Sequence, residues 1–100
     1  MGVAKIRNIR LRKRIIQILK SYDGDELPSA SALLELVLQS GMSQRMVGST
    51  ARIAQICRTT KGIGSFTGKV CDGKGEFYTA ELYYLDSEED FNDWVASKMG

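Results

Sequence analysis

Residues 41–61, GMSQRMVGSTARIAQICRTTK, contain a turn-rich lead-in and one short amphipathic segment, and the fold is inferred outward from them. Ser49 is typical of a helix N-cap because its hydroxyl can accept a backbone N–H of the first turn. At 3.6 residues per turn the two sides of the segment differ: one carries Ile53, Ala54, Ile56 and Cys57, the other Arg52, Gln55 and Thr59. We therefore predict a helix over residues 49–61 with its aliphatic side in the core.

The other side of this helix offers guanidinium, amide and hydroxyl groups and no acid. Hydrogen-bond donors of this kind read base edges and bind phosphates in the major groove of DNA. The alternative is that Arg52 and Gln55 are ordinary solvated helix residues.

The composition limits the possible fold, location and ligands of the protein. One hundred residues with 43% hydrophobic content suffice for one domain with one modest core. No apolar run approaches the roughly 20 residues that span a bilayer, and the basic N-terminus lacks the apolar stretch of a secretion signal. The chain has no His, and Cys57 and Cys71 lack CxxC spacing, so we expect no metal, no cofactor and two reduced thiols. A cytoplasmic, nucleoid-associated protein is expected, with no membrane partner.

Charge is segregated along the chain. Residues 1–20 contain seven Lys or Arg and no acid, and residues 36–75 contain six Lys or Arg and one acid. Residues 21–35 contain four acids and no base, and residues 76–100 contain seven acids and one Lys. A basic side and an acidic side would orient the molecule in the field of a polyanion, although a solvated charge run needs no partner.

Apolar periodicity predicts a helix over residues 9–22, whose first turns are crowded with basic residues, and a second, strongly apolar helix over residues 29–40. Ser29 or Ser31 would cap the second helix, and Gly41 would end it. Between the helices, Asp23-Gly24 is a turn signal and residues 25–27 could form a very short strand.

After residue 61 the pattern changes to strands. Residues 65–70 and 76–85 flank the glycine-rich turn CDGKG, which predicts a β-hairpin. Ser87 and the acids after it are typical of a helix start, so a closing helix is expected. Its apolar stripe of Phe91, Trp94 and Val95 either packs on the domain or forms the seam of a homodimer. Light scattering on the wild type and on Trp94→Ala would distinguish these two.

An enzyme is not expected. The usual general base is missing because there is no His, and the acids of residues 88–93 are explained by helix capping. The segment GIGSFTGK at residues 62–69 is superficially similar to a phosphate loop, but Val70 stands where Ser or Thr would bind Mg²⁺, and the segment precedes a strand.

The order helix, short strand, helix, helix, hairpin over residues 9–85 resembles the winged helix-turn-helix domain. In particular residues 32–62, an apolar helix followed by RMVGSTARIAQICRTTKGI, are similar to the two-helix core of small archaeal and bacterial winged-helix proteins. The resemblance implies an α+β, mostly helical fold with a three-helix core and a hairpin wing at residues 65–85. The expected helix at residues 86–100 is an addition to that pattern. Residues 1–8 would form a basic N-terminal arm.

The resemblance also implies roles for individual residues. Arg52 and Gln55 would face guanine and adenine edges, and the remaining DNA contacts would hold phosphates or add sequence-independent affinity. These contacts are Thr50, Thr59, Arg58, Gln44 and Arg45 around the recognition helix, Lys69 and Lys74 on the wing, and Arg10, Arg12 and Lys13 on the first helix.

Three functions follow from this interpretation. The first is a transcriptional regulator that binds double-stranded DNA, with helix 49–61 in the major groove. The second is an architectural protein that binds any duplex. The third is a winged-helix module for protein–protein interaction.

Overall fold

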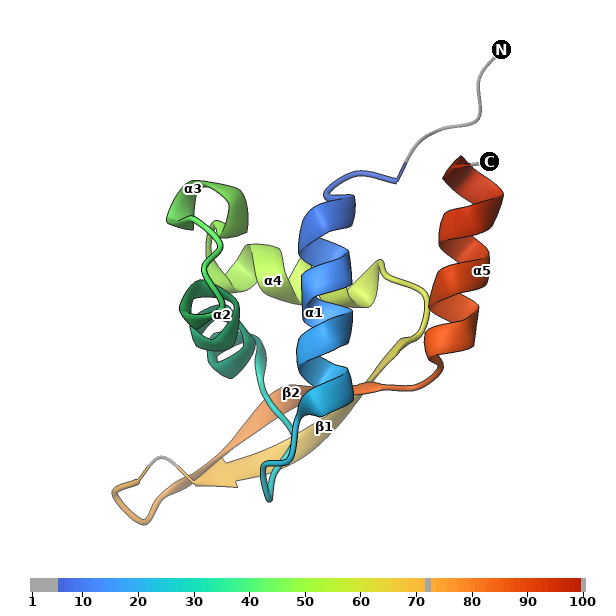
Figure 1. Cartoon of the computed structure of the whole chain (residues 1–100). Coiled ribbons are helices and arrows are strands. Elements are labelled where there is room, and N and C mark those ends of the chain that lie inside the picture. Colours follow the sequence, from blue (N-terminus) through green and yellow to red (C-terminus); the bar gives the residue numbers. More distant parts are fainter. Residues whose placement is uncertain (1–5, 72, 100) are drawn as a thin grey trace.

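The computed structural model describes residues 6–71 and 73–99, so most of the expected N-terminal arm lies outside the described residues. Within these ranges the chain forms five helices and one two-stranded antiparallel sheet, which confirms the expected α+β class (Figure 1). The elements are α1 (Ile9–Ser21), α2 (Ala30–Gln39), α3 (Gln44–Val47), α4 (Thr50–Arg58), β1 (Ile63–Cys71), β2 (Phe77–Leu85) and α5 (Glu88–Met99).

The core lies where α1, α2 and α4 meet over the base of the hairpin. In Figure 1, α1 crosses in front of α4, and α2 lies beside both. The buried side chains come from every third or fourth position of these helices, as the sequence periodicity predicts. The cluster consists of Leu11, Ile15, Leu19, Ala30, Leu33, Val37, Val47, Ile53, Ile56, Cys57 and Tyr83.

Serine side chains cap the N-termini of four of the helices. The hydroxyls of Ser29, Ser43 and Ser49 each accept a backbone N–H three residues on, at 3.3 Å. Ser87 does the same for Asp90 at 3.0 Å. The predicted starts of α2, α4 and α5 are therefore confirmed, with Ser29 as the cap of α2.

The end of α4 differs from the prediction, because the helix stops at Arg58 and not at Lys61. The Thr59 hydroxyl donates to the Gln55 carbonyl at 2.8 Å, and the Thr60 hydroxyl donates to that of Ile56. These side chains satisfy carbonyls that a further turn would have used. Gly62 then takes a positive φ of 95°, which turns the chain into β1.

One element was not predicted, and one local prediction is wrong. The lead-in at residues 41–48 contains the one-turn helix α3, held by Val47, which is fully buried. The short strand expected at residues 25–27 is absent; instead Ser29 forms an isolated bridge with Leu82, and the Tyr83 N–H donates to the Pro28 carbonyl at 3.0 Å. These two contacts join the segment directly before α2 to strand β2.

The hairpin and α5 extend from opposite sides of the helical core (Figure 1). The strands pair from Ile63 opposite Leu85 to Cys71 opposite Phe77, which confirms the predicted hairpin. At its base the N–H groups of Asp86 and Ser87 donate to the Gly62 carbonyl at 2.8 and 3.1 Å. This pair of bonds fixes the direction in which α5 leaves the sheet.

Candidate nucleic-acid interface

The outward side of α4 is the candidate interface. Ile53, Ile56 and Cys57 are buried, so the opposite side of the helix faces outward. Ala51, Gln55 and Arg58 lie three or four residues apart on that outward side, and all three are exposed. Among the residues of α4 itself there is no acid. The predicted division of this helix into an aliphatic and a polar side is confirmed.

Arg52 lies on the flank of α4 that faces the start of α1. Its Nη2 donates to Asn8 Oδ1 at 2.7 Å, and its aliphatic stem lies over Gly48, where an added Cβ would come within 2.5 Å of Arg52 Cδ. Asn8 has a left-handed backbone with φ 59°. The guanidinium is thus exposed but held in place, beside a shallow hollow that Arg7 and Gln55 also line.

Arg12 is not available to DNA, which corrects the prediction made for it. Its side chain is only 7% exposed and lies at the C-terminal end of α4. Nη1 donates to the Ile56 carbonyl at 3.1 Å and to the Thr59 hydroxyl at 3.0 Å, and also to the Thr60 hydroxyl. Nε donates to the Arg7 carbonyl at 2.8 Å. A cation at this position satisfies carbonyls at the negative end of the α4 dipole, so Arg12 is a structural residue.

The Trp94 ring covers the same guanidinium, with Arg12 Cζ 5.6 Å from the ring centroid. Burial lowers the pKa of Arg12, and the nearby Cys57 partly opposes that change. Arginine nevertheless stays protonated at physiological pH.

Arg58 also differs from its predicted role as a phosphate ligand. Its Nε and Nη2 bind the carboxylate of Glu81 on β2 in a two-point contact, at 3.0 and 3.1 Å. The hydrogen bond with Arg58 lowers the pKa of Glu81, so this carboxylate is ionised at neutral pH. A phosphate could bind Arg58 only by displacing Glu81. The Glu81 carboxylate also places a negative charge on the side of α4 that faces the hairpin.

The other predicted contacts are exposed but scattered. Gln44 and Arg45 lie on α3, where Gln44 Nε2 donates to the Gly48 carbonyl at 3.2 Å. Thr50 and Thr59 lie at the two ends of α4, and Lys69 and Lys74 lie on the hairpin. Arg10 and Lys13 lie on the outer side of α1. The fold therefore brings Arg52, Gln55 and Thr59 together, and leaves the hairpin lysines apart from them.

The hairpin exposes aromatic side chains that the sequence pattern identifies only as strand formers. Phe66 is 48% exposed, Tyr78 is 50% and Phe77 is 70%. Across the hairpin Phe66 lies opposite Leu82, Tyr78 opposite Val70 and Phe77 opposite Cys71. No local pattern in the sequence distinguishes these exposed rings from buried ones.

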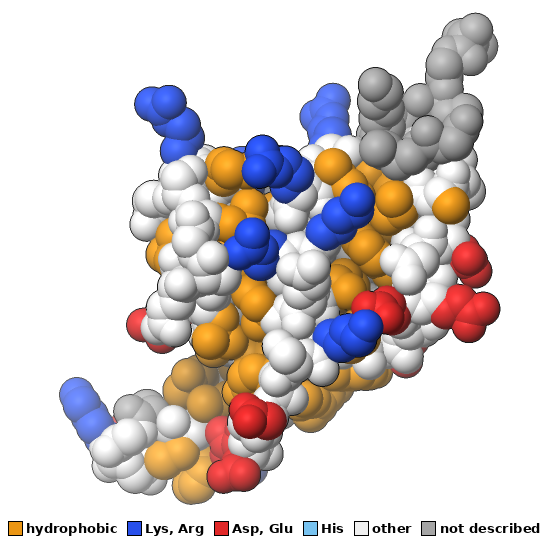
Figure 2. Space-filling view, in the orientation of Figure 1, with side chains coloured by type: hydrophobic (Ala, Val, Ile, Leu, Met, Phe, Trp, Pro, Cys, Tyr) orange, Lys and Arg blue, Asp and Glu red, His pale blue; other side chains and the backbone are white. Residues whose placement is uncertain are grey.

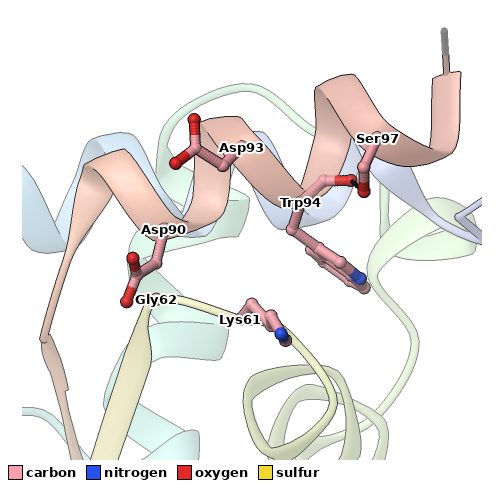
Figure 3. Close-up of a pocket in the computed structure, with 6 residues that line it drawn as sticks. All are labelled: Lys61, Gly62, Asp90, Asp93, Trp94 and Ser97. Carbon is pink, nitrogen blue, oxygen red and sulfur yellow. Dashed lines mark hydrogen bonds between the residues drawn. The ribbon is translucent and has the colours of Figure 1, made fainter.

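The apolar stripe of α5 packs mainly on the domain. Phe91 is 3% exposed, which corrects its assignment to a homodimer seam. Trp94 points from α5 toward the Lys61–Gly62 segment, as Figure 3 shows, and both Trp94 and Val95 are half-buried. Asp90 and Lys61 line the same hollow of about 480 Å³. An ion pair between Lys20 and Glu88 at 3.0 Å joins α1 to the start of α5.

The two thiols should differ sharply in reactivity. Cys57 is 1% exposed, and burial raises its pKa to about 12, whereas Cys71 is exposed. At pH 8 only about one Cys57 in 10⁴ is a thiolate, and the thiolate is the reactive form. We expect a disulfide reagent to modify Cys71 at once and Cys57 only on unfolding, as followed by mass spectrometry. Cys71→Ser should leave the native protein unmodified; rapid reaction of that variant would show that Cys57 is accessible.

Comparison with protein-family models, curated proteins and solved structures finds no match to this chain. Within the described residues no helix is long and apolar enough to cross a bilayer, and no group of three His, Cys, Asp or Glu side chains is arranged to hold a metal ion. Any assignment of function therefore depends on the chemistry of the surfaces described above.

Proposed function

We propose that this chain binds double-stranded DNA through the outward side of α4, as a transcriptional regulator of the winged helix-turn-helix type. The observation that carries the proposal is the division of α4: it anchors three apolar side chains in the core and leaves Gln55 on its outward side and Arg52 exposed on its flank, with no acid in the helix. A cytoplasmic, nucleoid-associated location belongs to the same proposal.

The dimensions of α4 support this placement. An α-helix with its side chains is about 10–12 Å across, and the major groove is about 12 Å wide, so α4 can enter it. Ala51 lies on the outward side beside Gln55, and its small side chain allows the helix backbone to approach the base edges. Gln55 would read an adenine edge, and Arg52 a guanine edge from the flank.

The order of elements also supports the winged-helix interpretation. The chain passes through α1, a bridge at Ser29, α2, the α3–α4 pair and a hairpin. The hairpin would act as the wing and would place Lys69 near an adjacent backbone. The pairing of Arg58 with Glu81 restricts the part of α4 that can contact DNA to its first two turns, beside the Arg7–Asn8 segment.

Replacing Gln55 or Arg52 by Ala should relax sequence preference, with a loss of about 1–3 kcal/mol on the preferred site and little change on bulk DNA. Arg45→Ala is the matched control, because removing a phosphate ligand from α3 should weaken binding to every sequence and flatten the salt slope by about one unit. Competition binding on a preferred and a scrambled duplex measures both effects. Equal losses on the two duplexes for Gln55→Ala would show that no base is read there.

Selection from randomised duplexes at two salt concentrations tests the proposal as a whole. An enriched motif that persists at the higher salt is the result expected of a regulator. Equal affinity for all duplexes, with a steep salt dependence, would identify the architectural alternative, which the basic outer side of α1 favours. Absence of binding at moderate salt would overturn DNA binding and would leave the exposed aromatic hairpin as a surface for a protein partner.

A further inference from the structure

Asn8, the residue directly before α1, has an unusual backbone conformation. Its φ of 59° and ψ of 37° lie in the left-handed region, and among the described residues it is the one residue other than glycine with a positive φ. Asparagine adopts this region more readily than most residues, but at some cost in energy. Residues held in such conformations cluster at functional sites. A contact of the Asn8 side chain is therefore expected to explain the conformation.

The Asn8 side chain does not serve the helix that it precedes. An asparagine at an N-cap usually has an extended backbone, and its side-chain oxygen accepts a backbone N–H of the first turn. The Asn8 side chain makes no capping hydrogen bond. Its Oδ1 accepts instead from Arg52 Nη2 at 2.7 Å, from a residue 44 positions further along the chain. The left-handed backbone thus directs the amide away from α1 and toward the guanidinium on α4.

Arg52 is exposed, yet its side chain is held at two points. Its stem lies over Gly48, where an added Cβ would come within 2.5 Å of Arg52 Cδ, and its end is bound by Asn8. Asn8 and Arg52 both line two shallow hollows. One, of about 340 Å³, is shared with Gln55, and the other, of about 370 Å³, is shared with Met46. Without the contact to Asn8 the guanidinium could turn into either hollow.

The acceptor is a neutral amide, so it orients the guanidinium without cancelling its charge. Arg58 shows the alternative, because its guanidinium is neutralised by the carboxylate of Glu81. Among the described residues no carboxylate lines either hollow beside Arg52. Figure 2 shows Lys and Arg side chains gathered over the first turns of α1 and over α3, with acids toward the hairpin and α5. An arginine that is oriented but still charged is suited to an anionic partner.

From these contacts we propose that Asn8 is a positioning residue, which holds the Arg52 guanidinium in the direction from which it reads a guanine edge beside Gln55. The inference rests on the proposed function. The contact with Asn8 occupies one of the five N–H groups of the guanidinium, so Nη1 keeps its donors for the base. A long side chain that is already ordered loses less entropy on binding. Asn8 thus increases sequence preference without reading a base itself.

The variant Asn8→Gly tests this role, because glycine adopts the left-handed backbone freely and lacks the acceptor oxygen. Competition binding compares a duplex that carries the motif enriched by selection with a scrambled duplex. The ratio of the two affinities should fall about two- to tenfold, the range expected for the ordering of one long side chain. Affinity for the scrambled duplex should change by less than about twofold, since the phosphate contacts remain.

Thermal unfolding of Asn8→Gly distinguishes positioning from a structural role. The contact is exposed and no capping bond is lost, so the melting temperature should stay within about 4 °C of the wild-type value. Equal losses of affinity on the two duplexes, together with a lower melting temperature, would identify a structural residue and would overturn the inference.

A double-mutant cycle separates positioning from a direct contact of Asn8 with DNA. In the Arg52→Ala background, Asn8→Gly should change the preference by less than about twofold, because there is no guanidinium left to orient. A loss as large as in the wild-type background would show that Asn8 contacts the DNA itself, and would overturn the inference.

The conservative variant Asn8→Asp keeps an acceptor oxygen at the same place. It should retain the preference between the two duplexes but bind both more weakly, because a carboxylate cancels the charge of the guanidinium. A loss of preference as large as that of Asn8→Gly would show that the acceptor oxygen does not set the preference, and would count against the inference.

The failure of each proposal has its own signature. A wild type that reads its motif through Arg52, while Asn8→Gly leaves the preference unchanged, overturns the positioning role and leaves the proposed function standing. A wild type that binds no duplex at all overturns both.

Discussion

Replacing Arg12 by Met is expected to lower the free energy of unfolding by about 3 kcal/mol. The substitution keeps most of the aliphatic stem but removes the donors that satisfy the Ile56 carbonyl, the Thr59 and Thr60 hydroxyls and the Arg7 carbonyl. Hydrogen bonds from a charged donor contribute about 1.5–3 kcal/mol each at most, and buried acceptors left without a partner add to the loss. The cation–π interaction with the Trp94 ring disappears as well. Urea denaturation measures the change.

Arg10→Met is the matched control for this experiment, because Arg10 lies on the same helix and is exposed. Its effect on stability should be within about 0.5 kcal/mol. The comparison separates the two roles considered for Arg12. If Arg12→Met were as stable as the wild type and instead bound DNA more weakly, the residue would be a phosphate ligand and the buried arrangement would be wrong.

The substitution Gly62→Ala should be nearly as damaging and should lower the free energy of unfolding by at least about 2 kcal/mol. The backbone at Gly62 has φ 95°, and an added Cβ would lie 2.5 Å from the Ser87 carbonyl oxygen and 2.9 Å from Phe91 Cβ. A side chain at this φ costs about 1 kcal/mol or more by itself. The clash involves the backbone at the start of α5, which cannot rotate away as a side chain would. Thermal unfolding followed by the fluorescence of Trp94, the single Trp of the chain, reports on α5 directly.

The variant Gly73→Ala measures the cost of a side chain at a positive φ without a clash. Gly73 has a similar φ of 87° but nothing within 4 Å of an added Cβ. We expect Gly73→Ala to lower the free energy of unfolding by about 1 kcal/mol. The difference in this free energy between the two variants therefore measures how firmly α5 is held against the base of the hairpin. Equal losses would mean that α5 moves aside without cost and that its packing through Phe91 contributes little to stability.

The elements that can be predicted are those whose signals are local. Ser49 and Ser87 mark helix starts because a hydroxyl and the N–H groups it caps are three residues apart in sequence. The hairpin follows from two strand-like runs around a glycine-rich turn. The exposed polar side of α4 follows from its 3.6-residue periodicity, so the sequence pattern alone places Gln55 correctly.

The errors concern residues whose partners are far away in sequence. Arg12 resembles Arg10 and Lys13 in sequence, yet it alone reaches the end of α4, where the Ile56 carbonyl lies 44 residues further along the chain. Arg58 is predicted to hold a phosphate, but strand pairing brings Glu81 beside it. No local pattern distinguishes a basic residue that will meet a carbonyl or a carboxylate from one that will remain in solvent.

The amino-acid sequence by itself therefore determined the four longer helices, the hairpin and the division of α4 into an apolar and a polar side, because these depend on side chains within one or two turns of each other. Only the tertiary structure decided which cations are buried, which are paired and which remain exposed. That choice depends on how α1, α4 and β2 cross in space, and the energy of a charged group is set by the atoms that surround it after the chain has folded.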